Sequence, residues 1–121
     1  MTRILYVDDE DDIREIAVMS LELESDFEVR SCDSGCEMLS TAPEWKPDLI
    51  LLDVMMPVMD GPSAFAKLRE TPETAGIPVV FITARTQAQD VEALKASGAR
   101  GVIAKPFDPM TLAAVVRGYL A

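Results

Sequence analysis

The stretch Leu49-Ile50-Leu51-Leu52-Asp53 places four apolar residues in a row before a carboxylate. A short run that is apolar at every position is typical of a central parallel strand, because helices cover such a strand on both faces. Comparable runs precede and follow it along the chain. Working outward from this stretch, the candidate strands are Ile4–Val7, Phe27–Arg30, Leu49–Leu52, Val79–Ile82 and Val102–Ala104.

Helical patterns fill the intervals between these strands. In most intervals apolar residues recur three or four positions apart, as on the buried face of a helix. The patterns cover residues 13–21, 34–41, 64–68, 91–94 and 112–120, of which 34–41 has the least regular pattern. Strands that alternate with helices in this way predict a doubly wound α/β fold. We expect a single domain over residues 1–121.

The composition limits the classes of function that the chain can have. Its 121 residues carry a formal net charge of -10 and include no histidine. This charge disfavours contact with anionic membranes, and with nucleic acid by this domain alone. The absence of histidine excludes Ser-His-Asp catalysis, histidine zinc sites and a phosphotransfer histidine. The apolar runs are too short to span a membrane and no signal peptide is recognisable, so we expect a cytoplasmic protein.

Polar side chains follow four of the predicted strands. Asp8 and Asp9 follow the first strand, Asp53 the third, Thr83 the fourth and Lys105 the last. In an open α/β sheet, ligands bind beyond the carboxyl ends of the strands. Three carboxylates, a hydroxyl and an ammonium group should therefore meet at one edge of the sheet.

Each of these residues, taken alone, also has an ordinary structural explanation. An aspartate after a strand is often a helix N-cap, Thr83 could close a local turn, and Lys105 could lie in solvent. Glu10, Asp11 and Asp12 suit the first turn of a helix, where negative charge complements the helix dipole. The combination favours a functional site, because four strand ends carry complementary groups.

The chemistry that fits this set is phosphoryl transfer assisted by a metal ion. Carboxylates in contact repel one another and stay ionised together only beside a cation. Oxygen ligands without a neighbouring thiol or imidazole favour Mg2+ over zinc or copper. An aspartate can attack phosphorus and become an aspartyl phosphate. The metal ion and Lys105 would then neutralise the phosphoryl oxygens.

Four segments together resemble the receiver domain of bacterial two-component response regulators, in particular single-domain regulators of the chemotaxis type. They have the order and spacing of that family and span essentially the whole chain. The segments are Ile4–Glu10, Pro47–Gly61, Pro78–Ala84 and Gly101–Phe107. The resemblance implies a flavodoxin-like three-layer (βα)5 sandwich, whose parallel strands have the order 2-1-3-4-5.

The resemblance also implies a metal site with defined ligands. Asp9, Asp53 and the backbone carbonyl of Met55 would hold Mg2+, and Asp8 would act mainly through water. Asp53 would in addition be the residue that accepts the phosphoryl group. A magnesium phosphohydrolase, which is an alternative class, typically has a second aspartate at the position of Met55.

Two further residues have roles that the resemblance implies. Thr83 would be the hydroxyl that switches position on phosphorylation, and Lys105 would contact the phosphoryl group. The bond between Lys105 and Pro106 is usually cis in this family. One departure is Val102, where the family often has a Tyr or Phe whose ring moves with the threonine. We therefore expect the output to run through the loop after Thr83 or through a bound partner.

A receiver of this kind is a phosphorylation-dependent signalling switch. It would take its phosphoryl group from a histidine kinase or a histidine phosphotransfer protein and signal through protein–protein contacts. It would catalyse its own phosphorylation and dephosphorylation without being a conventional enzyme. The downstream target stays open, and the face around Val102 suits a homodimer on activation or a different protein. An alternative is a receiver-like docking module that is not phosphorylated in use.

Overall fold

The computed structural model describes residues 1–120, over which five strands alternate with five helices. The strands form one parallel sheet in the order β2-β1-β3-β4-β5, which confirms the predicted fold. The strands are β1 (Thr2–Val7), β2 (Phe27–Cys32), β3 (Leu49–Asp53), β4 (Val79–Thr83) and β5 (Gly101–Ala104). The helices are α1 (Asp11–Glu22), α2 (Gly35–Trp45), α3 (Gly61–Glu70), α4 (Ala88–Ala96) and α5 (Leu112–Leu120).

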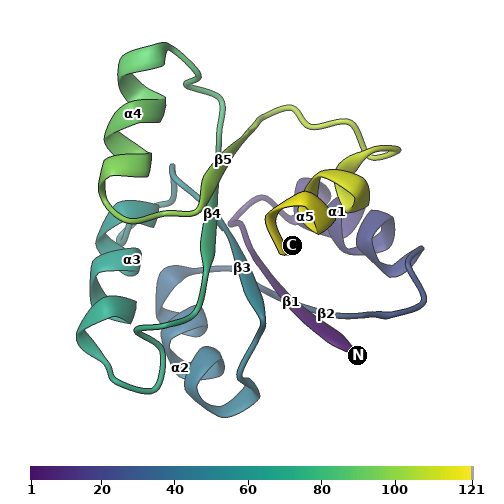
Figure 1. Cartoon of the computed structure of the whole chain (residues 1–121), viewed down its shortest axis with the longest axis horizontal. Helices are drawn as coiled ribbons and strands as arrows, with labels where there is room; N and C mark the ends of the chain where they lie inside the picture. Colours follow the sequence, from purple (N-terminus) through teal and green to yellow (C-terminus); the bar gives the residue numbers. More distant parts are fainter. Residues whose placement is uncertain (121) are drawn as a thin grey trace.

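Two layers of helices cover the sheet, with α1 and α5 on one face and α2, α3 and α4 on the other (Figure 1). Successive residues of a strand point to opposite faces, so the central strands supply both hydrophobic cores. Leu5 and Leu52 belong to the core that includes Phe65 of α3. Ile4 and Leu51 belong to the core under α1 and α5. Every residue of β3 and β4 is buried, as their apolar sequences predict.

Helix α2 continues beyond its sequence pattern, to Trp45. Its start is well capped: the Ser34 side chain accepts a hydrogen bond from the backbone N–H of Glu37. Pro43 lies inside the helix and removes one backbone donor. Burial of Trp45 against the sheet supports the last turn beyond the proline.

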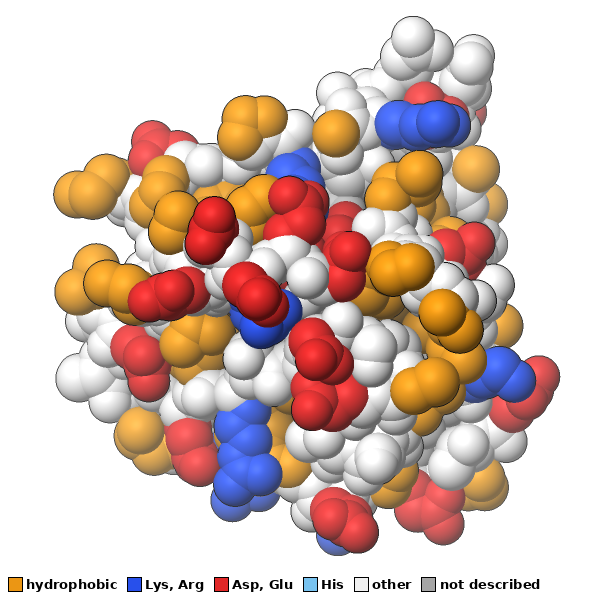
Figure 2. Space-filling view, turned by 180° about the vertical axis from the view of Figure 1, so that it is seen from behind, with side chains coloured by type: hydrophobic (Ala, Val, Ile, Leu, Met, Phe, Trp, Pro, Cys, Tyr) orange, Lys and Arg blue, Asp and Glu red, His pale blue; other side chains and the backbone are white. Residues whose placement is uncertain are grey.

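The surface reflects the acidic composition. On the face that Figure 2 shows, Asp and Glu side chains lie among hydrophobic side chains. Within residues 1–120, no helix is both long enough and apolar enough to cross a membrane.

Candidate functional site

Lys105 joins three carboxylates at the carboxyl edge of the sheet. Its Nζ atom lies 3.1 Å from Asp8 Oδ2, after β1, and 3.3 Å from Asp53 Oδ2, at the end of β3. The carboxylate of Glu10 is 3.1 Å from the same nitrogen. Asp8 and Asp53 are buried, whereas Glu10 is exposed. One oxygen from each of the three residues lies within 4.8 Å of the others, so one lysine serves a compact group of negative charges.

The three carboxylates are hereafter called the carboxylate cluster (Asp8, Glu10 and Asp53). The backbone after β3 packs closely on the start of α3 beside this cluster. The N–H of Gly61 donates to the Val54 carbonyl at 2.9 Å. A Cβ atom at position 61 would lie 2.5 Å from the backbone oxygen of Asp53, closer than a methyl group allows. Glycine at this position therefore lets α3 begin directly behind the end of β3.

Thr83 and Lys105 meet where β4 and β5 end. The backbone N–H of Lys105 donates to the Thr83 carbonyl at 2.8 Å. Thr83 is buried, and its Oγ1 accepts a hydrogen bond of 3.0 Å from the backbone N–H of Arg85. The peptide bond between Lys105 and Pro106 is cis, as the resemblance implies. The hydroxyl of Thr83 thus closes a local turn and lies at the same edge of the sheet as Lys105.

Burial shapes the ionisation of the site. Burial, followed by repulsion from Asp8, raises the pKa of Asp53 from 3.8 to about 6, although Lys105 opposes this shift. Burial disfavours the charge on Lys105, but hydrogen bonds to Glu10 and Asp8 hold the pKa of its ammonium group above the ordinary value. The carboxylate cluster therefore holds more negative charge than Lys105 neutralises, and a further cation would be bound favourably.

The donor set of the carboxylate cluster fits Mg2+. It offers only carboxylate oxygens, which are hard ligands of the kind that Mg2+ takes together with water and phosphate oxygens. An acidic site of this kind suits a hard divalent cation.

Two residues expected at the metal site lie outside the carboxylate cluster. Asp9 is exposed and does not belong to the group of three carboxylates. The Met55 side chain is 59% exposed, which is compatible with the expected role because that role uses its backbone carbonyl. Asp8, for which a contact through water was expected, lies in the cluster.

Two residues at the site had no predicted role. Glu10 was assigned to the first helical turn, and it is indeed the N-cap of α1, but its side chain makes no capping hydrogen bond and bonds Lys105 instead. Tyr6 donates its hydroxyl proton to Asp8 Oδ2 at 3.0 Å. The period of two along β1 places Tyr6 and Asp8 on the same face, and this signal could have revealed the contact.

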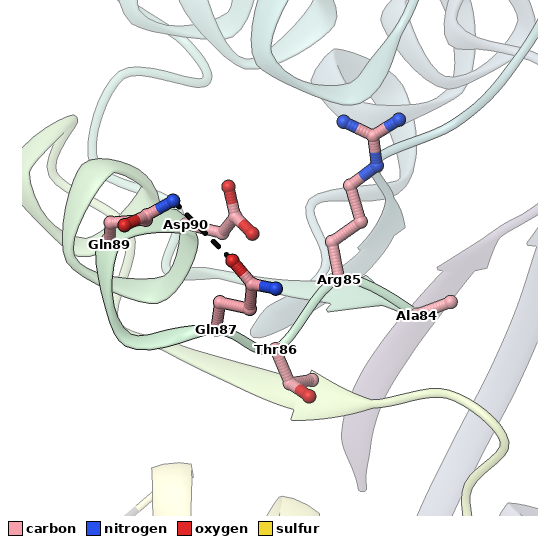
Figure 3. A pocket seen from close by; sticks show the side chains of 6 residues that line it. All are labelled: Ala84, Arg85, Thr86, Gln87, Gln89 and Asp90. Atoms are coloured by element: carbon pink, nitrogen blue, oxygen red, sulfur yellow. Dashed lines mark hydrogen bonds between the residues drawn. The ribbon is translucent and has the colours of Figure 1, made fainter.

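An open polar hollow lies directly after Thr83, in the loop between β4 and α4. Figure 3 shows its side chains, with Gln89 donating to Gln87 while Arg85 extends away from them. The lining residues are Ala84, Arg85, Thr86, Gln87, Gln89 and Asp90. The backbone N–H of Arg85 donates to the Thr83 hydroxyl, so a rotation of this hydroxyl would directly affect the loop.

Comparisons with known proteins agree with this geometry. Residues 4–117 match the model of the response regulator receiver domain. The chain is 38% identical to the DNA-binding dual master transcriptional regulator RpaA of Synechocystis sp., over 99% of this chain and 49% of RpaA. It is 39% identical to the DNA-binding response regulator MtrA of Mycobacterium tuberculosis, over 98% of this chain and 50% of MtrA. It therefore spans about half the length of these curated relatives.

The fold has the same kind of relatives. The chemotaxis response regulator CheY4 of Vibrio cholerae superposes with a TM-score of 0.89 at 32% identity, over 98% of each chain. A response regulator from Desulfuromonas acetoxidans superposes with a TM-score of 0.88 at 28% identity, over 99% of this chain and 97% of that one. With its acidic cluster at the carboxyl edge of a 2-1-3-4-5 sheet, the chain belongs to the response regulator receiver domains, which are phospho-accepting signalling modules rather than conventional enzymes.

Proposed function

We propose that Asp53 is the phosphoacceptor of a phosphorylation-dependent switch. The observation that carries this proposal is the contact between its buried carboxylate and Lys105 Nζ at 3.3 Å, beside the second buried carboxylate, Asp8. The family implies a histidine kinase as the partner, and a histidine phosphotransfer protein is the other donor with the right chemistry. With either donor, the reaction would take place in the cytoplasm.

In the proposed step, a carboxylate oxygen of Asp53 forms a bond to phosphorus while the phosphorus–nitrogen bond of the donor's phosphohistidine breaks. The imidazole leaves with the bonding electron pair and takes up a proton. Lys105 then holds an oxygen of the transferred phosphoryl group, as it holds the carboxylate before transfer. Thr83 donates its hydroxyl proton to another phosphoryl oxygen.

We infer that the divalent cation of this site is Mg2+. Asp9, Asp53 and the Met55 carbonyl would be its ligands, with Asp8 acting through water. When bound, the ion supplies positive charge that neutralises the phosphoryl oxygens. The surplus negative charge of the carboxylate cluster supports this inference, since it disfavours an incoming phosphate until a cation is present.

The test is intact-mass spectrometry after incubation with Mg2+ and a small phosphodonor. We expect a single phosphoryl adduct on the wild-type chain, none on Asp53→Asn, and none after chelation of the metal. An adduct of equal yield on Asp53→Asn would overturn the assignment of the phosphoacceptor. The absence of any adduct on the wild type would favour a docking module that is not phosphorylated in use.

Self-association can be measured on the same samples. We propose that phosphorylation exposes a binding face around Val102, which a second copy or a downstream protein then contacts. Light scattering before and after phosphorylation distinguishes the two, because a mass that doubles indicates a homodimer and an unchanged mass leaves a different protein as the partner.

A further inference from the structure

Tyr6 contacts both Asp8, in the carboxylate cluster, and Phe107, in the loop after Lys105. Its side chain is fully buried, and its hydroxyl donates to Asp8 Oδ2 at 3.0 Å. Its ring packs edge-on against Phe107, with centroids 6.5 Å apart. Phe107 lies two residues after Lys105, beyond the cis peptide bond to Pro106. Tyr6 therefore connects a carboxylate of the cluster with the loop that carries the lysine.

The hydrogen bonds of Asp8 show what the Tyr6 hydroxyl does. Oδ2 accepts from both Tyr6 and Lys105, and Oδ1 accepts from the backbone N–H of Glu10 at 3.0 Å. A carboxylate has about four positions at which it can accept a hydrogen bond or bind a cation. Three of these positions are used, and the free one is on Oδ1.

We propose that Tyr6 is a positioning residue of the metal site. Its hydroxyl fixes the rotation of the Asp8 carboxylate so that only Oδ1 is offered to the cation or to a water bound to it. This inference rests on the proposed function, because it takes Mg2+ to bind at Asp53 with Asp8 beside it. A buried phenol needs a hydrogen-bond partner, so a purely structural role for the same contact has to be separated by experiment.

Tyr6→Phe separates the two roles, because it keeps the ring and its packing on Phe107 and removes only the hydroxyl. Partners that orient a metal ligand typically change metal affinity by about tenfold or more when they are lost. We expect calorimetry to show Mg2+ binding about tenfold weaker in Tyr6→Phe. Phosphorylation should be slow at low Mg2+ and return to the wild-type rate at saturating Mg2+.

Tyr119→Phe is the matched control, since Tyr6 and Tyr119 are the two tyrosines of the chain. Its hydroxyl donates to the Val102 carbonyl at 3.3 Å and takes no part in the carboxylate cluster. Its Mg2+ affinity should equal that of the wild type. Equal affinity in Tyr6→Phe as well would overturn the positioning role and leave the proposed function intact, whereas a wild type that binds no Mg2+ would overturn both.

A measurement on the wild-type chain keeps the inference testable if Tyr6→Phe fails to fold. With carbon-13 in the tyrosine rings, the two ring signals can be followed in a titration with Mg2+ alone. We expect the Tyr6 signal to shift as the metal binds while the Tyr119 signal stays in place. A Tyr6 signal that does not move while Mg2+ binds would overturn the inference.

Discussion

The two ends of the sheet hold their charges in opposite ways. At the amino end, Arg117 bonds Glu24 and Asp26 in solvent, and its guanidinium lies over the Phe27 ring. At the carboxyl end, Lys105 is shared by three carboxylates, two of which are buried. Water screens the charges around Arg117, so they cost little free energy. Around Lys105, burial makes every unpaired charge unfavourable.

A second cation near the carboxyl end does not remove this imbalance. Arg14 donates to the backbone carbonyl of Asp8 and to the carboxylate of Asp11 on the surface of α1. The fold thus holds an excess of negative charge at one edge of the sheet, and the contrast with the amino end indicates that this excess serves the binding of a cation and a phosphoryl group. Four experiments test whether the two ends of the sheet differ in this way.

The largest effect is expected from Lys105→Met, which removes the cation that the three carboxylates share. Breaking a largely buried ion pair from one side leaves its partners without compensation and typically costs about 3 kcal/mol or more. We expect the free energy of unfolding, measured with urea in the presence of a chelator, to fall by about 3 kcal/mol. Added Mg2+ should recover part of this loss, because the ion compensates the same charges.

Arg117→Met is the control at the amino end. Its carboxylate partners lie in solvent, where water and salt screen the pair, so the loss should be much smaller than for Lys105→Met. Equal losses for the two variants would contradict the idea that the ends of the sheet differ.

Asp53→Asn should stabilise the protein in the presence of a chelator at neutral pH. The pKa of Asp53 is raised from 3.8 in the unfolded chain to about 6 in the fold, so the folded state binds the proton more tightly. Ionised Asp53 therefore destabilises the fold above about pH 6, by about 2–3 kcal/mol, and this penalty disappears below about pH 4. The stabilisation in Asp53→Asn should follow the same pH dependence in urea titrations.

Asp26→Asn at the amino end should have the opposite sign. A hydrogen bond from Arg117 holds the pKa of Asp26 below its usual value, so the ionised form favours folding above the unfolded pKa. Removing this charge should lower stability slightly at neutral pH and should have no effect in strong acid. If Asp53→Asn instead lowered stability at neutral pH, Lys105 would be shown to compensate the negative charge of the carboxylate cluster fully, contrary to the prediction above.

One glycine near each end of the sheet tests how closely the backbone is packed there. A Cβ in Gly61→Ala would meet the Asp53 carbonyl at 2.5 Å, whereas a Cβ in Gly76→Ala, in the segment before β4, has no neighbour within 4 Å. Overpacking of this kind typically destabilises by about 1–3 kcal/mol. We expect thermal unfolding to show such a loss for Gly61→Ala and almost none for Gly76→Ala. Phosphorylation of Gly61→Ala should also slow, because Asp53 is displaced.

The amino acid sequence predicts the fold and the meeting of the strand ends better than it predicts individual contacts. Fully apolar runs such as residues 49–52 are typical of strands in the middle of a covered sheet, and the ends of these strands determine where Asp8, Asp53 and Lys105 meet. The bond between Glu10 and Lys105 was missed because the position of Glu10 at the start of a helix has a sufficient local explanation, and the bond joins residues 95 positions apart. Tyr6 was missed because a tyrosine in an apolar strand is usually a core residue.

The smallest effect is expected in the backbone beyond Thr83. If the Thr83 hydroxyl turns to the phosphoryl group, its bond with the Arg85 N–H is lost, and the loop before α4 must adjust. No residue of α4 is buried, so little packing resists a shift of this helix.

At β5 the Tyr119 ring lies against Gly101, and Val102 has no ring to move inward. We therefore expect amide chemical shifts to change over residues 84–100 on phosphorylation, and to stay constant over residues 71–78 at the amino end of β4. Unchanged shifts in 84–100 would show that the signal leaves the site by another route, for which the Tyr6–Phe107 contact is the nearest candidate.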